Sequence, residues 1–269
     1  MSRPGTGRPS PSGRVRDASC SRPSAPRSGR PTRGHRSSAC PPSPRPPTPP
    51  TPPPTGRSPL SAPELPDSVL DAVPVLPVVV IDRVADAVPL ARALVAGGLP
   101  AIELTLRTPV ALEAMAAIAA EVPEILLGAG TVTTPAEAEA SVAAGARFLV
   151  SPGCTPTLLA GMQATGVPFL PGTSTVSEVM AVLEAGLTEM KFFPAEAAGG
   201  APYLTSVGGP LPQARFCPTG GITPASAPTY LGLANVGCVG GSWITPGDAV
   251  ATGDWERISK LAAEAAALG

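Results

Sequence analysis

One lysine of this 269-residue sequence lies where it could react with a carbonyl group. Lys191 is one of only two lysines in the chain and stands in the apolar, strand-like run "EMKFFPA". Side chains alternate along a strand, so Lys191 points away from Met190 and Phe192, whose shared face suits packing against helices. Burial and nearby positive charge favour the neutral amine, which is the form that attacks carbonyls. The alternative is an inward lysine that pairs with an acid or extends its amine to the rim.

A second apolar run supplies a carboxylate and a guanidinium on one face. In "AIELTLRT", Glu103 and Arg107 alternate with isoleucine and leucine, and their Cα atoms would lie ~13 Å apart along a strand. We expect Glu103 deep in the fold, where it would move protons. We expect Arg107 near the mouth, where it would grip a substrate carboxylate and favour the neutral amine of Lys191. The same spacing also fits a buried network of Glu, Lys and Arg that does no chemistry.

The composition excludes several catalytic classes. The one histidine, His35, lies in the first 60 residues, so the rest of the chain has no imidazole for a Ser-His-Asp triad or for metal ligation. The five cysteines form no CxxC pair, which indicates buried free thiols in a reducing compartment. We therefore expect no metal and no cofactor, although an oxygen-only Mg²⁺ site is compatible with the residues present. Carboxylate acid–base catalysis and lysine chemistry remain.

Eight short apolar runs alternate with Ala- and Leu-rich stretches of helical period after residue 60. The runs begin at residues 75, 100, 124, 147, 168, 189, 214 and 236, and several intervening stretches end in glycine, the usual residue after a helix. This alternation predicts parallel strands joined by helices, closed into a (β/α)8 TIM barrel. The rival, a doubly wound open sheet, would carry a glycine-rich fingerprint after the first strand, and "VVVIDRVADAV" has no glycine. We also expect residues 61–72 to form a helix across the bottom of the barrel.

Glycine pairs follow the seventh and eighth predicted strands. The two strand ends read Thr219, Gly220 and Gly221, and Gly240, Gly241 and Ser242. Backbone N–H groups of such glycines can face an anion, and the loops after strands 7 and 8 of (β/α)8 barrels often bind phosphate. Tight turns are a commoner use of glycine pairs, but two pairs at adjacent strand ends favour a phosphate site.

Residues 1–60 differ in composition from the rest of the chain. They hold 17 of the 38 prolines and 11 arginines against one acid, a net charge of +10, whereas residues 61–269 carry −11. A Pro-, Arg- and Ser-rich segment without apolar periodicity predicts a disordered tail, and residues 61–269 predict one barrel domain. Nucleic-acid binding by the basic tail is a less favoured hypothesis than a solvated extension. No apolar run reaches the length of about 18 residues that a transmembrane helix needs.

With these residues placed, the sequence from about Pro63 to its end resembles the 2-keto-3-deoxy-6-phosphogluconate (KDPG) aldolase family, which also cleaves 4-hydroxy-2-oxoglutarate. The matching motifs are "ALVAGG", "IELTLRT", "GAGTV", "SPG", "PGTSTVSE", "KFFPAE", "RFCPTGGI" and "GGSW". The resemblance implies a metal-free class I aldolase in which Lys191 forms a Schiff base and Glu103 is the general acid–base. It also implies substrate-binding residues: Arg107 and Thr131 at the pyruvate carboxylate, Phe193 against the pyruvyl carbons, and Gly220, Gly221, Gly241 and Ser242 at the sugar phosphate, with Thr219 beside them.

The same resemblance implies an activity and a cellular context. Lys191 would form an iminium with the C2 ketone, and cleavage of the C3–C4 bond would give pyruvate and glyceraldehyde 3-phosphate in the Entner–Doudoroff route. The expected partner is thus a small phosphorylated keto acid, and the expected form is a cytoplasmic homotrimer. Two alternatives stay open: an aldolase for the galactonate epimer of the substrate, and a phosphate-binding barrel isomerase without a covalent intermediate.

Overall fold

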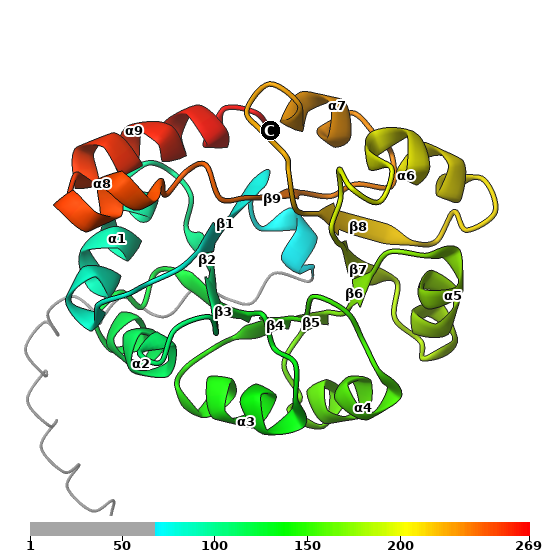
Figure 1. Cartoon of the computed structure of the whole chain (residues 1–269), viewed down its shortest axis with the longest axis horizontal. Coiled ribbons are helices and arrows are strands. Elements are labelled where there is room, and N and C mark those ends of the chain that lie inside the picture. The colour runs from blue at the N-terminus through cyan, green and yellow to red at the C-terminus, as the bar shows by residue number, and fades with distance from the viewer. Residues whose placement is uncertain (1–67) are drawn as a thin grey trace, which may run out of the picture. The chain divides into compact units, whose positions relative to one another are not determined.

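The structure is a computed structural model that describes residues 68–269. Parallel strands form a ring with helices around its outside (Figure 1). The strands are β1 (Val75–Val79), β2 (Ala101–Thr105), β3 (Leu126–Gly130), β4 (Phe148–Val150), β5 (Phe169–Leu170), β6 (Gly172–Thr173), β7 (Glu189–Phe192), β8 (Arg215–Pro218) and β9 (Val239–Gly241). The helices are α1 (Val84–Ala96), α2 (Ala111–Glu121), α3 (Pro135–Ala143), α4 (Pro156–Ala164), α5 (Val176–Glu184), α6 (Gly200–Gly208), α7 (Ala227–Leu231), α8 (Gly247–Thr252) and α9 (Trp255–Ala266). The tail predicted for residues 1–60 lies outside the described residues.

The ring contains the eight predicted strands, because β5 and β6 are two halves of the fifth. Six strands pair in the order β5-β4-β3-β2-β1-β9 and three in the order β6-β7-β8, all of them parallel. Parallel bridges between Phe216 and Val236 and between Thr219 and Gly240 join β8 to the β9 side. The predicted (β/α)8 barrel is therefore confirmed.

Pro171 separates β5 from β6 and fixes the backbone near Lys191. Proline has no N–H group to donate to a ladder, so the strand breaks at this residue. The carbonyl of Pro171 accepts the backbone N–H of Lys191 at 3.0 Å. On the other side of the break, the Ser151 hydroxyl accepts the N–H of Gly172 at 3.1 Å. The fifth strand thus pairs with β4 before the proline and with β7 after it.

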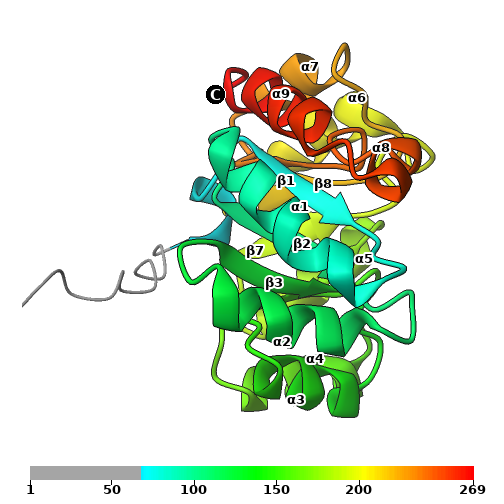
Figure 2. The ribbon, with the colours of Figure 1, turned by 90° about the vertical axis from the view of Figure 1, so that its left-hand side faces the viewer.

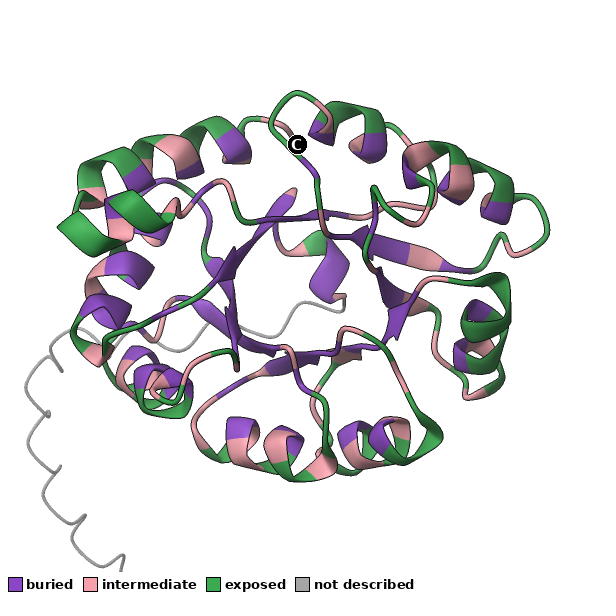
Figure 3. Cartoon of the chain, viewed as in Figure 1, coloured by how far each residue is buried: buried purple, intermediate pink, exposed green. Residues whose placement is uncertain are grey.

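The core lies both inside the ring and between the ring and its helices. Figure 3 shows the strands buried along the whole ring, and Figure 2 shows α1 over the outer face of β1 and β2. Outside β7, the Phe192 ring stacks on Tyr203 of α6 with centroids 5.2 Å apart and meets the Phe216 ring edge-on at 6.5 Å. Met190 is also buried. The prediction that Met190 and Phe192 face the helices is confirmed.

A 3₁₀ helix (Val69–Asp71) lies where β7 and β8 begin. Arg215, the first residue of β8, contacts Asp71 at 2.5 Å and Glu189, the first residue of β7, at 2.9 Å. These ion pairs hold the short helix against the bottom of the barrel. Residues 61–67 of the helix expected over 61–72 lie outside the described part of the chain.

Several helices begin at the signals that the sequence carries. Thr134 of α3 and Thr175 of α5 form capping boxes with Glu137 and Glu178. Hydrogen bonds lower the pKa of Glu178, and the largest effect comes from the backbone N–H of Ser174. This carboxylate therefore stays charged at the N-terminal, positive end of the α5 dipole. Within residues 68–269, none of the helices combines the length and apolar content that a membrane-spanning segment requires.

Replacement of Gly128 tests the packing inside the ring. A Cβ at Gly128 would lie 2.1 Å from Cζ of the buried Phe148 ring, whereas a Cβ at Gly153 would meet nothing within 4 Å. We expect Gly128→Ala to lower the free energy of unfolding by ~1–3 kcal/mol through overpacking, and Gly153→Ala to change it by less than ~0.5 kcal/mol. Urea denaturation followed by circular dichroism measures both. Equal midpoints for the two variants would contradict this packing.

Candidate active site

A buried ion pair joins β7 to β2 inside the barrel. The Nζ of Lys191 lies 3.0 Å from Oε1 of Glu103. Lys191 is 4% exposed and Glu103 is 0% exposed. Taking two charges out of water costs several kcal/mol per ion, so a pair this deep persists only with close geometry. Both side chains lie inside the barrel, as strand alternation predicts.

Gly130 of β3 makes room for the Glu103 carboxyl group. A Cβ at position 130 would lie 2.3 Å from Glu103 Oε1 and 2.6 Å from its Cγ. The second oxygen, Oε2, is buried and accepts no hydrogen bond from any group between residues 68 and 269. Buried polar atoms normally have a partner. Oε2 therefore keeps an unused capacity to accept a hydrogen bond.

Arg107 and Thr131 lie together at the carboxyl-end rim, just after β2, which contains Glu103, and β3, which ends at Gly130. Arg107 is exposed, and its Nε donates to the Thr131 hydroxyl at 3.3 Å. Among the described non-glycine residues, Thr131 alone has a positive φ, of 60°. A β-branched residue in the left-handed region costs ~1–3 kcal/mol, and such strain concentrates at functional sites. The guanidinium and the strained hydroxyl suit a carboxylate ligand.

A cavity of about 240 Å³ is lined by most of the predicted substrate-binding residues. It is lined by Val78, Arg107, Phe193, Thr219, Gly220, Gly221, Ile222, Gly240 and Ser242. Lys191 and Glu103 are not among the lining residues; the Nζ of Lys191 lies 5.4 Å from the centroid of the Phe193 ring, which does line the cavity. Two predicted substrate-binding residues, Thr131 and Gly241, do not line this cavity. Gly241 packs against Trp243, because a Cβ at position 241 would lie 2.5 Å from the Trp243 ring.

The turn after β8 has the backbone of an anion site. Gly220 and Gly221 both have positive φ, of 105° and 81°. Successive N–H groups in such a turn point toward one concave side and can hold a phosphate or a carboxylate. Residues that carry a side chain rarely adopt a positive φ, so glycine is required at both positions.

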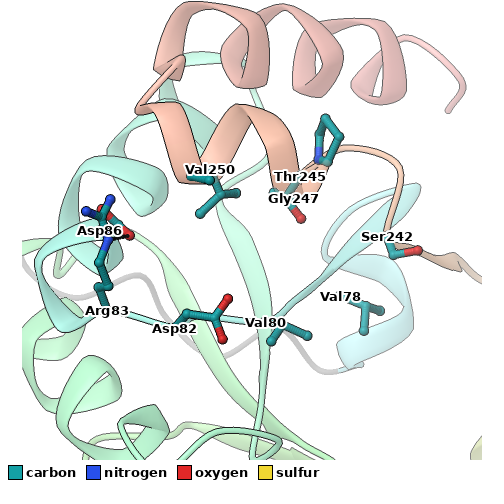
Figure 4. A pocket seen from close by; sticks show the side chains of 11 residues that line it. Val78, Val80, Asp82, Arg83, Asp86, Ser242, Thr245, Gly247 and Val250 are labelled. Atoms are coloured by element: carbon teal, nitrogen blue, oxygen red, sulfur yellow. Dashed lines mark hydrogen bonds and ion pairs between the residues drawn. The ribbon is translucent and has the colours of Figure 1, made fainter.

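A second cavity of about 680 Å³ adjoins the first through Val78 and Ser242 (Figure 4). It lies between the end of β1 and the segment that leads into α8. Arg83 at its edge is held by Asp86 through hydrogen bonds of 2.9 Å and 2.8 Å. Figure 4 shows the carboxylate of Asp82 directed into this space. The sequence pattern did not predict this cavity.

Two lining residues of the smaller cavity, Val78 and Ile222, were missed from the sequence. Val78 could have been found, because alternation in "VLPVVVID" places it on the inner face of the first strand. Ile222 carried no such signal, since loop residues have no fixed period, whereas Gly240 belongs to the second predicted glycine pair. Gly240 is needed because a Cβ there would lie 2.1 Å from the Thr219 hydroxyl oxygen.

The cysteines of the described part of the chain are free thiols, as expected. Cys217 and Cys238 are buried, and Cys154 is half-buried. Burial raises the pKa of Cys154 to about 11, so its thiol is protonated and unreactive at neutral pH.

A closed (β/α)8 barrel with a buried lysine–carboxylate pair inside it, below an arginine at the carboxyl-end rim, is the architecture of an α/β-barrel enzyme. The family model described as KDPG and KHG aldolase matches residues 67–261. The chain belongs to this aldolase family, and with it to the carbon–carbon lyases.

Individual relatives agree with the family. The chain is 52% identical over 199 residues to the KHG/KDPG aldolase of Escherichia coli, covering 74% of this chain and 93% of that protein. It is 49% identical to the KDPG aldolase of Legionella pneumophila, solved with pyruvate captured as a covalent carbinolamine intermediate, with a TM-score of 0.72 over 74% of this chain and 96% of that chain. A native KDPGal structure is 26% identical, with a TM-score of 0.65 over 73% and 94% of the two chains.

Breaking the buried pair should cost far more stability than breaking a surface pair. Lys191→Met leaves the Glu103 charge without its partner, and we expect the free energy of unfolding to fall by ~3–5 kcal/mol. The double variant Lys191→Met/Glu103→Leu should recover most of that loss, because no unpaired charge remains. The control is Arg92→Met, which breaks the exposed 3.3 Å pair with Glu121 and should cost less than ~1 kcal/mol. Urea denaturation of the three variants measures these losses. Equal losses of unfolding free energy for Lys191→Met and Arg92→Met would contradict the burial of the pair.

Proposed function

We propose that this chain is a class I aldolase that cleaves 2-keto-3-deoxy-6-phosphogluconate to pyruvate and glyceraldehyde 3-phosphate. We include 4-hydroxy-2-oxoglutarate, cleaved to pyruvate and glyoxylate, as a second substrate. The observation that carries the proposal is the buried Lys191 amine, 3.0 Å from Glu103 and 5.4 Å from the centroid of the Phe193 ring, which lines a cavity together with Arg107. The relatives at 49–52% identity bear names of the same activity.

The first step requires a neutral amine. A proton shift from Lys191 to Glu103 across their 3.0 Å contact keeps the buried pair neutral overall, so it adds no net charge to the interior. The amine nitrogen then attacks the C2 carbonyl carbon, and one of its two protons moves to the carbonyl oxygen to give a neutral carbinolamine. Glu103 returns its proton to that hydroxyl, which leaves as water, and an iminium forms on Lys191.

The second step breaks the C3–C4 bond. Glu103, directly or through a water, accepts the proton of the C4 hydroxyl, and its Oε2 has no protein partner among the described groups to compete for this role. The electron pair of the C3–C4 bond moves to C3, and the iminium nitrogen takes up the charge as an enamine. The aldehyde leaves. Protonation at C3 and hydrolysis of the iminium then release pyruvate and the free amine.

The remaining predicted residues would hold the two ends of the substrate. Arg107 and Thr131 are proposed to bind the pyruvate carboxylate, which suits their 3.3 Å contact at the rim. Phe193 would pack on the pyruvyl carbons. The phosphate would be bound by backbone N–H groups and hydroxyls of five residues: Thr219, Gly220, Gly221, Gly241 and Ser242. Gly241 would take part through its backbone alone.

The alternatives have weaker support. The galactonate epimer differs in the configuration of one hydroxyl, and the relative with that name is 26% identical against 52% for the KHG/KDPG aldolase. A barrel isomerase without a covalent intermediate leaves the buried lysine without a role. We therefore favour the gluconate substrate.

The cellular context is part of the proposal. We infer a homotrimer in the cytoplasm that serves the Entner–Doudoroff route, with residues 61–269 as the aldolase domain and residues 1–60 as a tail with no nucleic-acid partner. Val176 and Met180 lie one turn apart on α5 and are both exposed, and self-association over this face would cover them.

Borohydride trapping tests the covalent step. With pyruvate and sodium borohydride, the wild-type protein should gain one reduced pyruvyl adduct, and peptide mass spectrometry should map it to Lys191. Lys260→Ala, which removes the only other lysine of the chain, should be labelled like the wild type, and Lys191→Ala should not be labelled. An adduct on Lys260, or none in the wild type, would overturn the proposed function.

Steady-state rates separate the roles of the two catalytic residues. Glu103→Gln removes proton transfer and should lower kcat for KDPG by ~10²–10⁴-fold. Lys191→Ala should lower it further, because the covalent route is lost altogether. The exposed Glu113→Gln serves as the matched control and should turn over normally. A Lys191→Ala variant as active as Glu103→Gln would be incompatible with this mechanism.

A further inference from the structure

Beside the Gly220–Gly221 turn, a buried tyrosine and an exposed glutamate join helix α7 to the loop between β7 and α6. Glu196 lies between β7 and α6, and Tyr230 lies on α7. The Tyr230 hydroxyl donates to Oε1 of Glu196 at 2.8 Å. Tyr230 is 2% exposed, whereas Glu196 is exposed. The hydrogen bond therefore fixes a surface side chain to the core.

The glutamate in turn packs directly against the glycine turn. A Cβ at Gly221 would lie 2.8 Å from both Cβ and Cγ of Glu196, so Gly221 rests on this side chain. The backbone N–H of Glu196 donates to the carbonyl of Gly220 at 3.1 Å, and that of Ala195 donates to the carbonyl of Thr219 at 2.8 Å. Contacts of the backbone and the side chain thus converge on one turn.

A turn of two glycines needs such support. Glycine has the largest backbone freedom of any residue, so its N–H groups point at a ligand only when neighbours hold them. Preorganised groups bind more tightly because less motion is lost on binding. In this structure the neighbours of the turn are the Glu196 loop on one side and the Phe193 ring, 3.3 Å from a Cβ at Gly220, on the other.

The tyrosine keeps its proton over the whole physiological range. Burial, and then the hydrogen bond to Glu196, raise the pKa of Tyr230 well above its ordinary value. The phenol therefore remains a hydrogen-bond donor to Glu196. Gly200 allows this approach, because a Cβ there would lie 3.2 Å from the Tyr230 hydroxyl.

We propose that Glu196 and Tyr230 are positioning residues for the phosphate end of the substrate, which act by holding the N–H groups of Gly220 and Gly221. The proposal rests on the proposed function, since it presumes a phosphorylated keto acid in the adjoining cavity. Neither side chain touches the reacting carbons. Their loss should weaken binding of the phosphate and leave the chemical step intact.

The test compares a substrate that carries a phosphate with one that does not. For KDPG, Tyr230→Phe and Glu196→Ala should each raise KM by ~3- to 10-fold, the range of one hydrogen bond, with kcat unchanged. For 4-hydroxy-2-oxoglutarate, which has no phosphate, KM and kcat should match those of the wild type. Glu196→Gln keeps the acceptor for the tyrosine and removes a negative charge near the anion, so its KM for KDPG should stay at or below the wild-type value.

Controls separate this proposal from the proposed function. Tyr203→Phe removes the hydroxyl of the only other tyrosine of the chain and should leave both KM values unchanged. Glu196 is exposed, so its variants fold even if Tyr230→Phe does not. If wild-type protein neither cleaves KDPG nor traps pyruvate, the proposed function fails. If the wild type is active but KM rises equally for both substrates, or Glu196→Ala and Glu196→Gln behave alike, the positioning role is wrong.

Discussion

The 3.0 Å contact between Lys191 and Glu103 is the constraint on which the rest of this barrel depends. Two opposite charges in the interior of a protein are tolerated only when each is the partner of the other. The surrounding structure provides the space for this contact. Gly130 leaves room for the carboxyl group, and the carbonyl of Pro171 fixes the backbone of Lys191. The Lys191 amine on β7 is therefore held in place by Glu103 of β2, by the space at Gly130 of β3 and by the Pro171 carbonyl between β5 and β6.

The smaller cavity has two kinds of group that could attract a negatively charged ligand: a side-chain cation and a backbone turn. A charged side chain, Arg107, stands beside a strained threonine. The turn of Gly220 and Gly221 offers backbone dipoles instead, and Arg107 is the one cation among the residues that line the cavity. A side-chain cation recognises a carboxylate in a fixed bidentate geometry. A backbone turn depends on its neighbours for its shape, which is why the Glu196–Tyr230 contact matters for substrates that carry a phosphate.

Strand alternation predicted the fold and the centre of the site well. The period of two in "AIELTLRT" and "EMKFFPA" placed Glu103 and Lys191 on the inner face, and both are buried there. The same period placed Phe192 against the helices, where it stacks on Tyr203. These positions follow from geometry that every strand shares, so a single sequence is sufficient to find them.

Features set by close approach or by loops were beyond the sequence. The positive φ of Thr131 could not be read, because threonine rarely adopts it. The close packing of Gly241 against Trp243 also left no mark in the sequence. The cavity at Asp82 is formed by segments more than 150 residues apart in the chain, and no local pattern records such an encounter. The roles of Thr131 and Phe193 came from resemblance to a family and not from these patterns.

A crystal structure of the protein soaked with pyruvate tests the central claim most directly. The account predicts continuous electron density between Nζ of Lys191 and C2 of pyruvate, with the carboxylate of pyruvate at Arg107 and Thr131 and with Glu103 beside the new bond. Pyruvate bound without a covalent link, or at a site that Lys191 does not reach, would contradict it.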